Sequence, residues 1–140
     1  MALSFGFYSD AALTTPVLAR LPFVQPVASP VAIDRLVYFG SPLAGRLCQA
    51  ARDPGVDPIV ISITDASGET GSPAGDVRLA LTAGGLDAVT GGAPLELPET
   101  INSGVSAAVE VHIRVLDSTH ASGVNNDLAL VTNTLREAPA

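Results

Sequence analysis

The sequence predicts an all-β fold, a single-domain β-sandwich or jelly-roll-like domain of about eight strands with an extended N-terminal arm. Thirteen glycines and 11 prolines interrupt the 140 residues, roughly one in every six positions. No stretch keeps a 3.6-residue apolar period for three turns, whereas several short stretches alternate apolar and polar residues. A chain of this length buries enough surface for one core without metal or disulfide support.

The N-terminal segment, residues 1–30, is predicted to precede a sandwich domain of residues 31–140. A first strand is expected over residues 3–8, and the prolines between 16 and 30 remove backbone donors, which favours an edge strand or an arm. Two interpretations stay open: the first strand closes the core of its own domain, or an arm adds to a partner's sheet. In an intertwined dimer the segment would do both, closing one core and adding to the partner's sheet. The candidate partner-binding residues of this segment are Leu3, Phe5, Phe7 and Tyr8.

The later strands are expected where apolar residues alternate between turn-forming stretches. The predicted strands span residues 33–39, 45–50, 59–64, 77–81, 95–97, 106–117 and 128–135. The second of these is expected to form a hairpin with the first, and "DPGVDP" at 53–58 a tight loop. Residues 84–104 should be irregular apart from 95–97, with Val105 and Ala107 facing inwards after them. The predicted core consists of Ile59, Ile61, Ile63, Val77, Leu79, Val109, Val111 and Ile113.

The polar face of "SAAVEVHIRVLD" reads Glu110, His112, Arg114, three side chains that an active site could use. Side chains two positions apart on a strand share one face, so these three are expected to form a row of charges. A flat sheet face offers no cleft for a nucleophile or a second carboxylate. We therefore interpret them as a solvated or partner-facing row, and expect each alanine variant to leave the fold nearly intact.

The other chemistry-bearing residues match no known site pattern. His112 and His120 lack the spacing of zinc ligands, and the aspartate-rich turns lack the alternating pattern of a calcium loop. No phosphate-binding glycine motif or nucleophile elbow occurs, and Ser41 in "FGSPLAG" does not form one. The single Cys48 is interpreted as a small apolar residue. The sequence predicts no cofactor, no metal and no enzymatic activity.

Charge and hydropathy narrow the class of partner. The chain has seven arginines, no lysine, 14 acidic residues and a net charge of -7, which disfavours binding to nucleic acid phosphates. No apolar run approaches the roughly 20 residues that cross a membrane. Arginine suits interfacial ion pairs because its guanidinium is weakly hydrated. We therefore expect a protein partner.

Four stretches together resemble a capsid cement (decoration) protein of short-tailed bacteriophages. They are "LVYFGSP", "GVDPIVISITDASGETG", "DVRLALTAGGLDAVTGGAPLELPETINSGVSAAVEVHIRVLD" and "NNDLALVTNTLRE". The resemblance implies a jelly-roll-like homodimer, made in the host cytoplasm, that clamps neighbouring major capsid subunits on the outside of an HK97-like shell. It implies no catalytic residues.

Two other classes stay open as alternatives. One is another virion β-domain, such as a tail or baseplate module. The other is a carbohydrate-binding or adhesin sandwich, although the chain has no tryptophan and only two tyrosines on which sugars could stack.

Overall fold

The computed structural model describes residues 3–17, 31–65, 74–116 and 128–140 of the chain. In these residues the protein is all-β, as predicted, with ten strands and only three short 3-10 helices. The strands are β1 (Gly6–Tyr8), β2 (Ile33–Gly40), β3 (Arg46–Ala50), β4 (Ile59–Asp65), β5 (Val77–Ala80), β6 (Leu95–Leu97), β7 (Thr100–Asn102), β8 (Val109–Val115), β9 (Leu128–Thr132) and β10 (Leu135–Pro139). The 3-10 helices are η1 (Ala74–Asp76), η2 (Gly84–Asp87) and η3 (Val105–Ala107).

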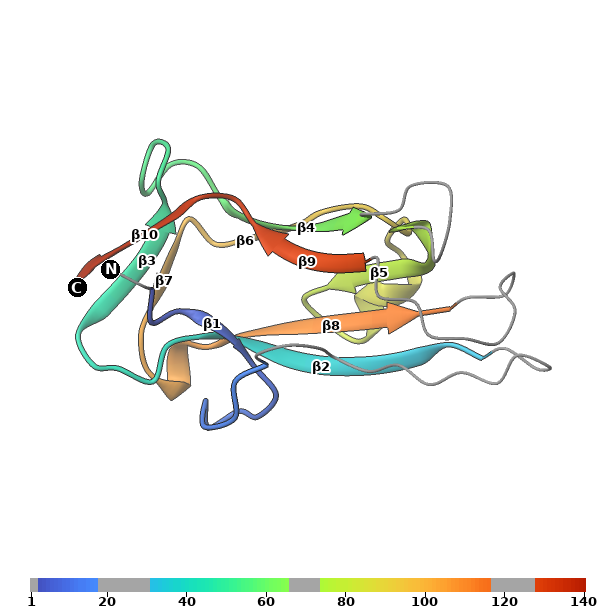
Figure 1. Cartoon of the computed structure of the whole chain (residues 1–140), viewed down its shortest axis with the longest axis horizontal. Coiled ribbons are helices and arrows are strands. Elements are labelled where there is room, and N and C mark those ends of the chain that lie inside the picture. Colours follow the sequence, from blue (N-terminus) through green and yellow to red (C-terminus); the bar gives the residue numbers. More distant parts are fainter. Residues whose placement is uncertain (1–2, 18–30, 66–73, 117–127) are drawn as a thin grey trace.

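One layer of the molecule is a four-stranded antiparallel sheet in the order β1-β2-β8-β5. The long strands β2 and β8 lie side by side along its length (Figure 1). Val37 lies opposite Val111 in this register, and Leu79 lies opposite Ile113, so the apolar residues of three strands share one face. We call this sheet the four-stranded layer, and its polar side the outer face.

The second layer is built from two three-stranded antiparallel sheets, β10-β3-β7 and β6-β4-β9. The same chain segments continue from one sheet to the other, so β9 runs on into β10 along one edge (Figure 1). Two backbone bonds join the halves: Ala51 N donates to Thr134 O (2.8 Å) and Asn133 N donates to Val60 O (3.1 Å). Asn133 and Thr134, the two residues between β9 and β10, therefore bond to either side of the loop 51–58, which separates the central strands β3 and β4. We call both sheets together the three-stranded layer.

Asn133 replaces part of the missing strand pairing at this junction. Its Oδ1 accepts a hydrogen bond from Val60 N at 3.0 Å, and its Nδ2 donates to Pro58 O at 3.1 Å. The side-chain amide thus offers the same donor and acceptor as a backbone peptide group. This allows the edge strand to kink between β9 and β10 without leaving the backbone of β4 unpaired.

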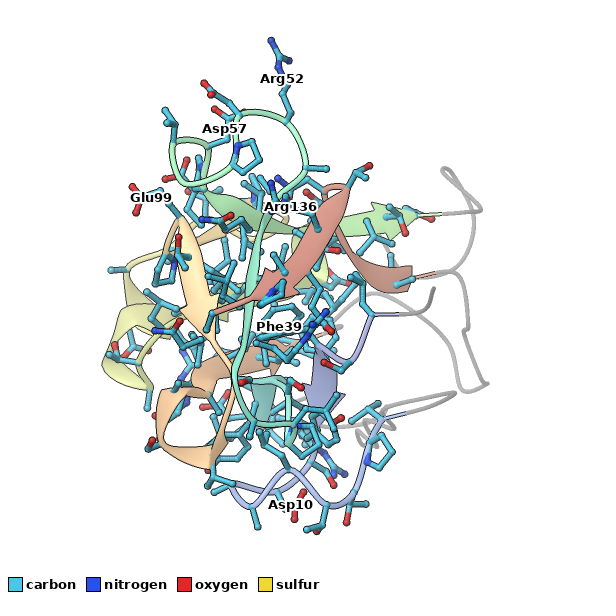
Figure 2. The ribbon with its side chains drawn as sticks, turned by 90° about the vertical axis from the view of Figure 1, so that its left-hand side faces the viewer. Asp10, Phe39, Arg52, Asp57, Glu99 and Arg136 are labelled. Atoms are coloured by element: carbon cyan, nitrogen blue, oxygen red, sulfur yellow. The ribbon has the colours of Figure 1, made fainter. Side chains whose placement is uncertain are left out.

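The core lies between the two layers, with Phe39 at its centre (Figure 2). The ring of Phe39 meets Phe7 edge-on at a centroid distance of 5.3 Å and Phe5 at 6.3 Å. Six of the eight predicted core residues are buried, and Ile63 and Val109 are partly buried and pack against them. The buried cluster consists of Phe5, Val37, Phe39, Cys48, Ile59, Ile61, Val77, Leu79, Leu97, Ile101, Val111 and Ile113.

The predicted hairpin between 33–39 and 45–50 is wrong. Strand β3 pairs with β10 and β7 in the opposite layer, because the chain crosses between layers at Gly40–Gly45. Gly45 adopts a positive φ of 67° in this crossing, a conformation that side-chain-bearing residues rarely adopt. An alternating apolar pattern shows which side of a strand is buried, but it does not show which layer the strand joins.

Other element boundaries also differ from the predictions, and the first strand begins at Gly6 instead of Leu3. Residues 105–107 form the 3-10 helix η3, so Val105 is exposed instead of facing inwards. The predicted last strand is two strands, β9 and β10, because Asn133 and Thr134 carry the chain between sheets. The stretch 84–104 contains β7 and η2 as well as β6. The jelly-roll connectivity stays a prediction.

Candidate functional site

The predicted row of charges lies on the outer face of β8 and contains an ion-pair cluster. Arg114 Nε and Nη2 donate to the two carboxylate oxygens of Asp34 at 2.8 and 3.0 Å, and Nη1 donates to Asp87 Oδ1 at 2.6 Å. Asp34 is the direct neighbour of Arg114 on β2, whereas Asp87 comes from η2. The hydrogen bonds from Arg114 lower the pKa of Asp34 below its ordinary value.

The short helix η2 explains why Arg114 is partly covered. It contacts β5 and β8, and its Leu86 is fully buried. Arg78 of β5 also binds it, since Nη1 donates to Leu86 O at 3.2 Å. The cluster therefore joins β2, β8 and η2 into one unit. Sequence analysis missed this unit because the "GGLD" turn has no period that would place it on a sheet face.

The other two residues of the row pair with each other. His112 Nε2 lies 3.3 Å from Glu110 Oε2, with the histidine partly buried and the glutamate exposed. Within the described ranges, no three His, Cys, Asp or Glu side chains gather in a way that could hold a metal ion. The structure thus brings Glu110 and His112 together on β8, and it gives Arg114 a separate set of partners.

The N-terminal candidates occupy different environments. Phe5 is 6% exposed and belongs to the core, Phe7 packs against the core, and Tyr8 is partly buried. Leu3 is 42% exposed. Strand β1 pairs with β2 of its own domain, with Phe7 opposite Phe39. Of the two interpretations, this structure has the first strand closing its own core; partner binding through the four residues stays a prediction, and residues 18–30 lie outside the described part.

A buried polar network links the two ends of the described chain. Glu137 of β10 is 8% exposed at its side chain and accepts hydrogen bonds from Ser4 N (2.8 Å), Ser4 Oγ (2.6 Å) and Arg46 Nε (3.0 Å). Ser4 Oγ also lies 2.7 Å from the Oγ of the fully buried Ser41. Burial alone raises the pKa of Glu137, but the hydrogen bonds outweigh burial and lower the pKa below its ordinary value.

This network is not foreseeable from sequence spacing. Its members come from the N-terminal segment, the β2–β3 crossing, β3 and β10, which lie far apart in the chain. The nearby Cys48 is buried, which raises the pKa of its thiol to about 11, with the charge of Glu137 adding to the effect. The thiolate is therefore scarce at neutral pH, and the residue behaves as the small apolar side chain that the sequence predicts.

A cavity of about 220 Å³ opens beside the ion-pair cluster. Its charged lining comes from Asp76, Arg78 and Arg114. The positive charge of Arg114 is already offset by two carboxylates. With Asp76, Asp34 and Asp87 against Arg78 and Arg114, the charges at and beside the cavity come close to balancing.

The loop 51–58 projects from the three-stranded layer (Figure 2, Arg52 and Asp57). Val56 N donates to Asp53 O at 3.0 Å across a turn that has Pro54 and Gly55 at its centre. Gly55 has a φ of 81°, so Pro-Gly occupies the positions that it favours in a type II turn. The predicted tight loop is confirmed. Val56 is 65% exposed on this ordered turn, which sequence analysis did not single out.

Comparison of the chain with protein-family models, with curated proteins and with solved structures gives no match. In the described ranges, none of the helices has the length and apolar character needed to cross a membrane. The feature that geometry singles out is thus a surface: the projecting loop 51–58, in which the exposed Val56 lies among the charged Arg52, Asp53 and Asp57.

Proposed function

We propose that the chain is a non-enzymatic virion structural protein that binds the outside of an HK97-like capsid shell as a homodimer and cements neighbouring major capsid subunits. The resemblance of its sequence to capsid cement proteins of short-tailed phages supports this role. So does the all-β fold with its interlayer core. A ligand that binds only the assembled lattice stabilises that lattice by mass action, and contact with two subunits adds avidity.

The structural observation that carries the proposal is the loop 51–58. It separates the central strands β3 and β4 of the three-stranded layer, and Asn133 and Thr134 bond to either side of it. Pro54 and Val56 place apolar surface at the end of a turn held by bonds from both Val56 N and Asp57 N to Asp53 O. A preorganised turn loses little conformational entropy on binding, which suits a contact repeated many times over a shell.

Co-sedimentation of the purified protein with expanded shells tests the role. We expect wild-type protein to sediment with shells and Val56→Asp to lose most of its binding, because it places a charge in an apolar contact. Val105→Asp is the matched control, since Val105 is similarly exposed but lies on η3. Melting temperatures of both variants equal to that of the wild-type protein would show that folding is unaffected.

Each result has a defined meaning. Wild-type protein that leaves shells undecorated overturns the proposed function. Decoration that Val56→Asp does not change, or that both variants lose equally, overturns the assignment of the contact to the loop.

A further inference from the structure

Three of the four sheet edges in the described chain are protected against pairing with another strand. Strand β1 has three residues, and its outer edge is occupied: Val17 N donates to Phe7 O at 2.9 Å and Ser9 N donates to Thr15 O at 2.9 Å. Strand β5 has four residues, and Gly92 N donates to Val77 O at 2.8 Å from outside the sheet. Short and covered edge strands are the devices by which β proteins avoid joining other sheets.

The third protected edge is that of β6 and β7. Each of these strands has three residues, and Pro98 and Glu99 separate them. Proline lacks the donor that a further strand would need, and Glu96 adds a charge in the middle of β6. This edge of the three-stranded layer is therefore poorly suited to pairing.

The fourth edge, formed by β9 and β10, is least protected along β9, because β10 carries the charged Arg136 and Glu137 and ends at Pro139. β9 and β10 follow one another from Leu128 with no proline or glycine before Pro139, and β9 itself carries no charge. No strand of the described chain pairs with its outer side. The side chain of Val131 in β9 is 41% exposed, on the side of the three-stranded layer that faces away from the core.

The direction of the free backbone groups follows from the register. Asn133 N donates to Val60 O, so Asn133 is bonded towards β4, and alternate residues of an antiparallel strand share that orientation. Val131 and Ala129 are therefore also bonded towards β4. Leu130 and Thr132 direct their N–H and C=O groups away from β4, towards the open edge.

We infer that β9 pairs antiparallel with β9 of a second copy of this chain, which joins two three-stranded layers into one continuous sheet. An antiparallel strand pair has the two-fold symmetry of a homodimer, so one unprotected edge supplies both halves of the interface. A chain of net charge -7 repels its copy. The uncharged β9 is where two copies approach with the least local repulsion, and Val131 and Ala129 then lie on one shared face.

This inference specifies the homodimer of the proposed function, and its test uses purified protein without shells. Sedimentation equilibrium over a range of concentrations should show wild-type protein at twice the 14.2 kDa chain mass. Val131→Glu sets like charges near the two-fold axis and should raise the dimer dissociation constant at least about tenfold. Asn102→Glu, which adds the same charge to the exposed β7 on the opposite edge, should not change it.

Thr132→Pro supplies an independent test of backbone pairing. It removes one N–H from the open edge and leaves the bonds to β4 in place, so we expect a folded monomer. If this variant does not fold, Val131→Glu decides alone.

A wild-type monomer at all concentrations, or dimers weakened equally by Val131→Glu and Asn102→Glu, would overturn the inference. A dimer that leaves shells bare contradicts the proposed function only, whereas a monomer that decorates shells contradicts this inference only.

Discussion

At the scale of single residues, Glu137 makes stability depend on pH. Its lowered pKa means that the paired carboxylate stabilises the folded state above the ordinary glutamate value, and that this contribution is lost as pH falls through the lowered pKa. Glu137→Gln should reduce stability at neutral pH by about 1–3 kcal/mol, because charge-assisted hydrogen bonds are lost. It should also flatten the dependence of melting temperature on acidic pH. Glu99→Gln, at an exposed position, is the control; an equal effect there would contradict the assignment to Glu137.

The row on β8 gives a second prediction at this scale. Arg114→Ala should lower the melting temperature more than Glu110→Ala, since Arg114 holds Asp34 and Asp87 with three hydrogen bonds, whereas Glu110 contacts His112 from an exposed position. High salt should reduce the difference by screening the ion pairs. The sequence predicts that all three substitutions are mild, and equal melting temperatures would support that expectation against the structural argument.

At the scale of elements, the N-terminal strand is expected to matter for folding. Phe5→Ala should cost about 3–5 kcal/mol of stability, as truncation of a buried phenylalanine does. Leu3→Ala should change it little, because Leu3 is largely exposed. Chemical denaturation of both variants measures the difference. A Phe5→Ala protein as stable as wild type would indicate that residues 3–8 act as a detachable arm.

The junction between β9 and β10 depends on one side chain. Asn133→Ala removes the acceptor of Val60 N and the donor to Pro58 O, and should cost about 1–2 kcal/mol. Amide hydrogen exchange should quicken at Val60, with much smaller changes at Val111 in the opposite layer. Unchanged exchange at Val60 would show that the backbone alone maintains the junction.

Much of the element pattern is predictable from the sequence, and its reasons are local. The strands at 59–65 and 95–97 are read from alternation and from the turn formers around them, because burying one face of a strand imposes a period of two. The pairing of β3, the network around Glu137 and the cover provided by η2 are not predictable in this way. Each depends on contacts between segments that are distant in the sequence, and a single sequence contains no period or spacing that specifies those contacts.

At the scale of the whole molecule, the loop 51–58 leaves and re-enters the three-stranded layer between Ala51 and Val60, which bond to neighbouring residues of the chain. Ala51 bonds to Thr134 and Val60 bonds to Asn133, so the two ends of the loop stay fixed whatever its length. Closure entropy grows slowly, by about 0.6 kcal/mol for each doubling of a flexible loop. The position therefore suits the display of a foreign peptide: a glycine- and serine-flanked epitope inserted after Gly55 should remain accessible to its antibody, with the melting temperature lowered by only a few degrees. If the virion role holds, the same turn contacts the shell, so the insertion should leave the isolated protein folded and recognised by antibody while it abolishes the decoration of shells.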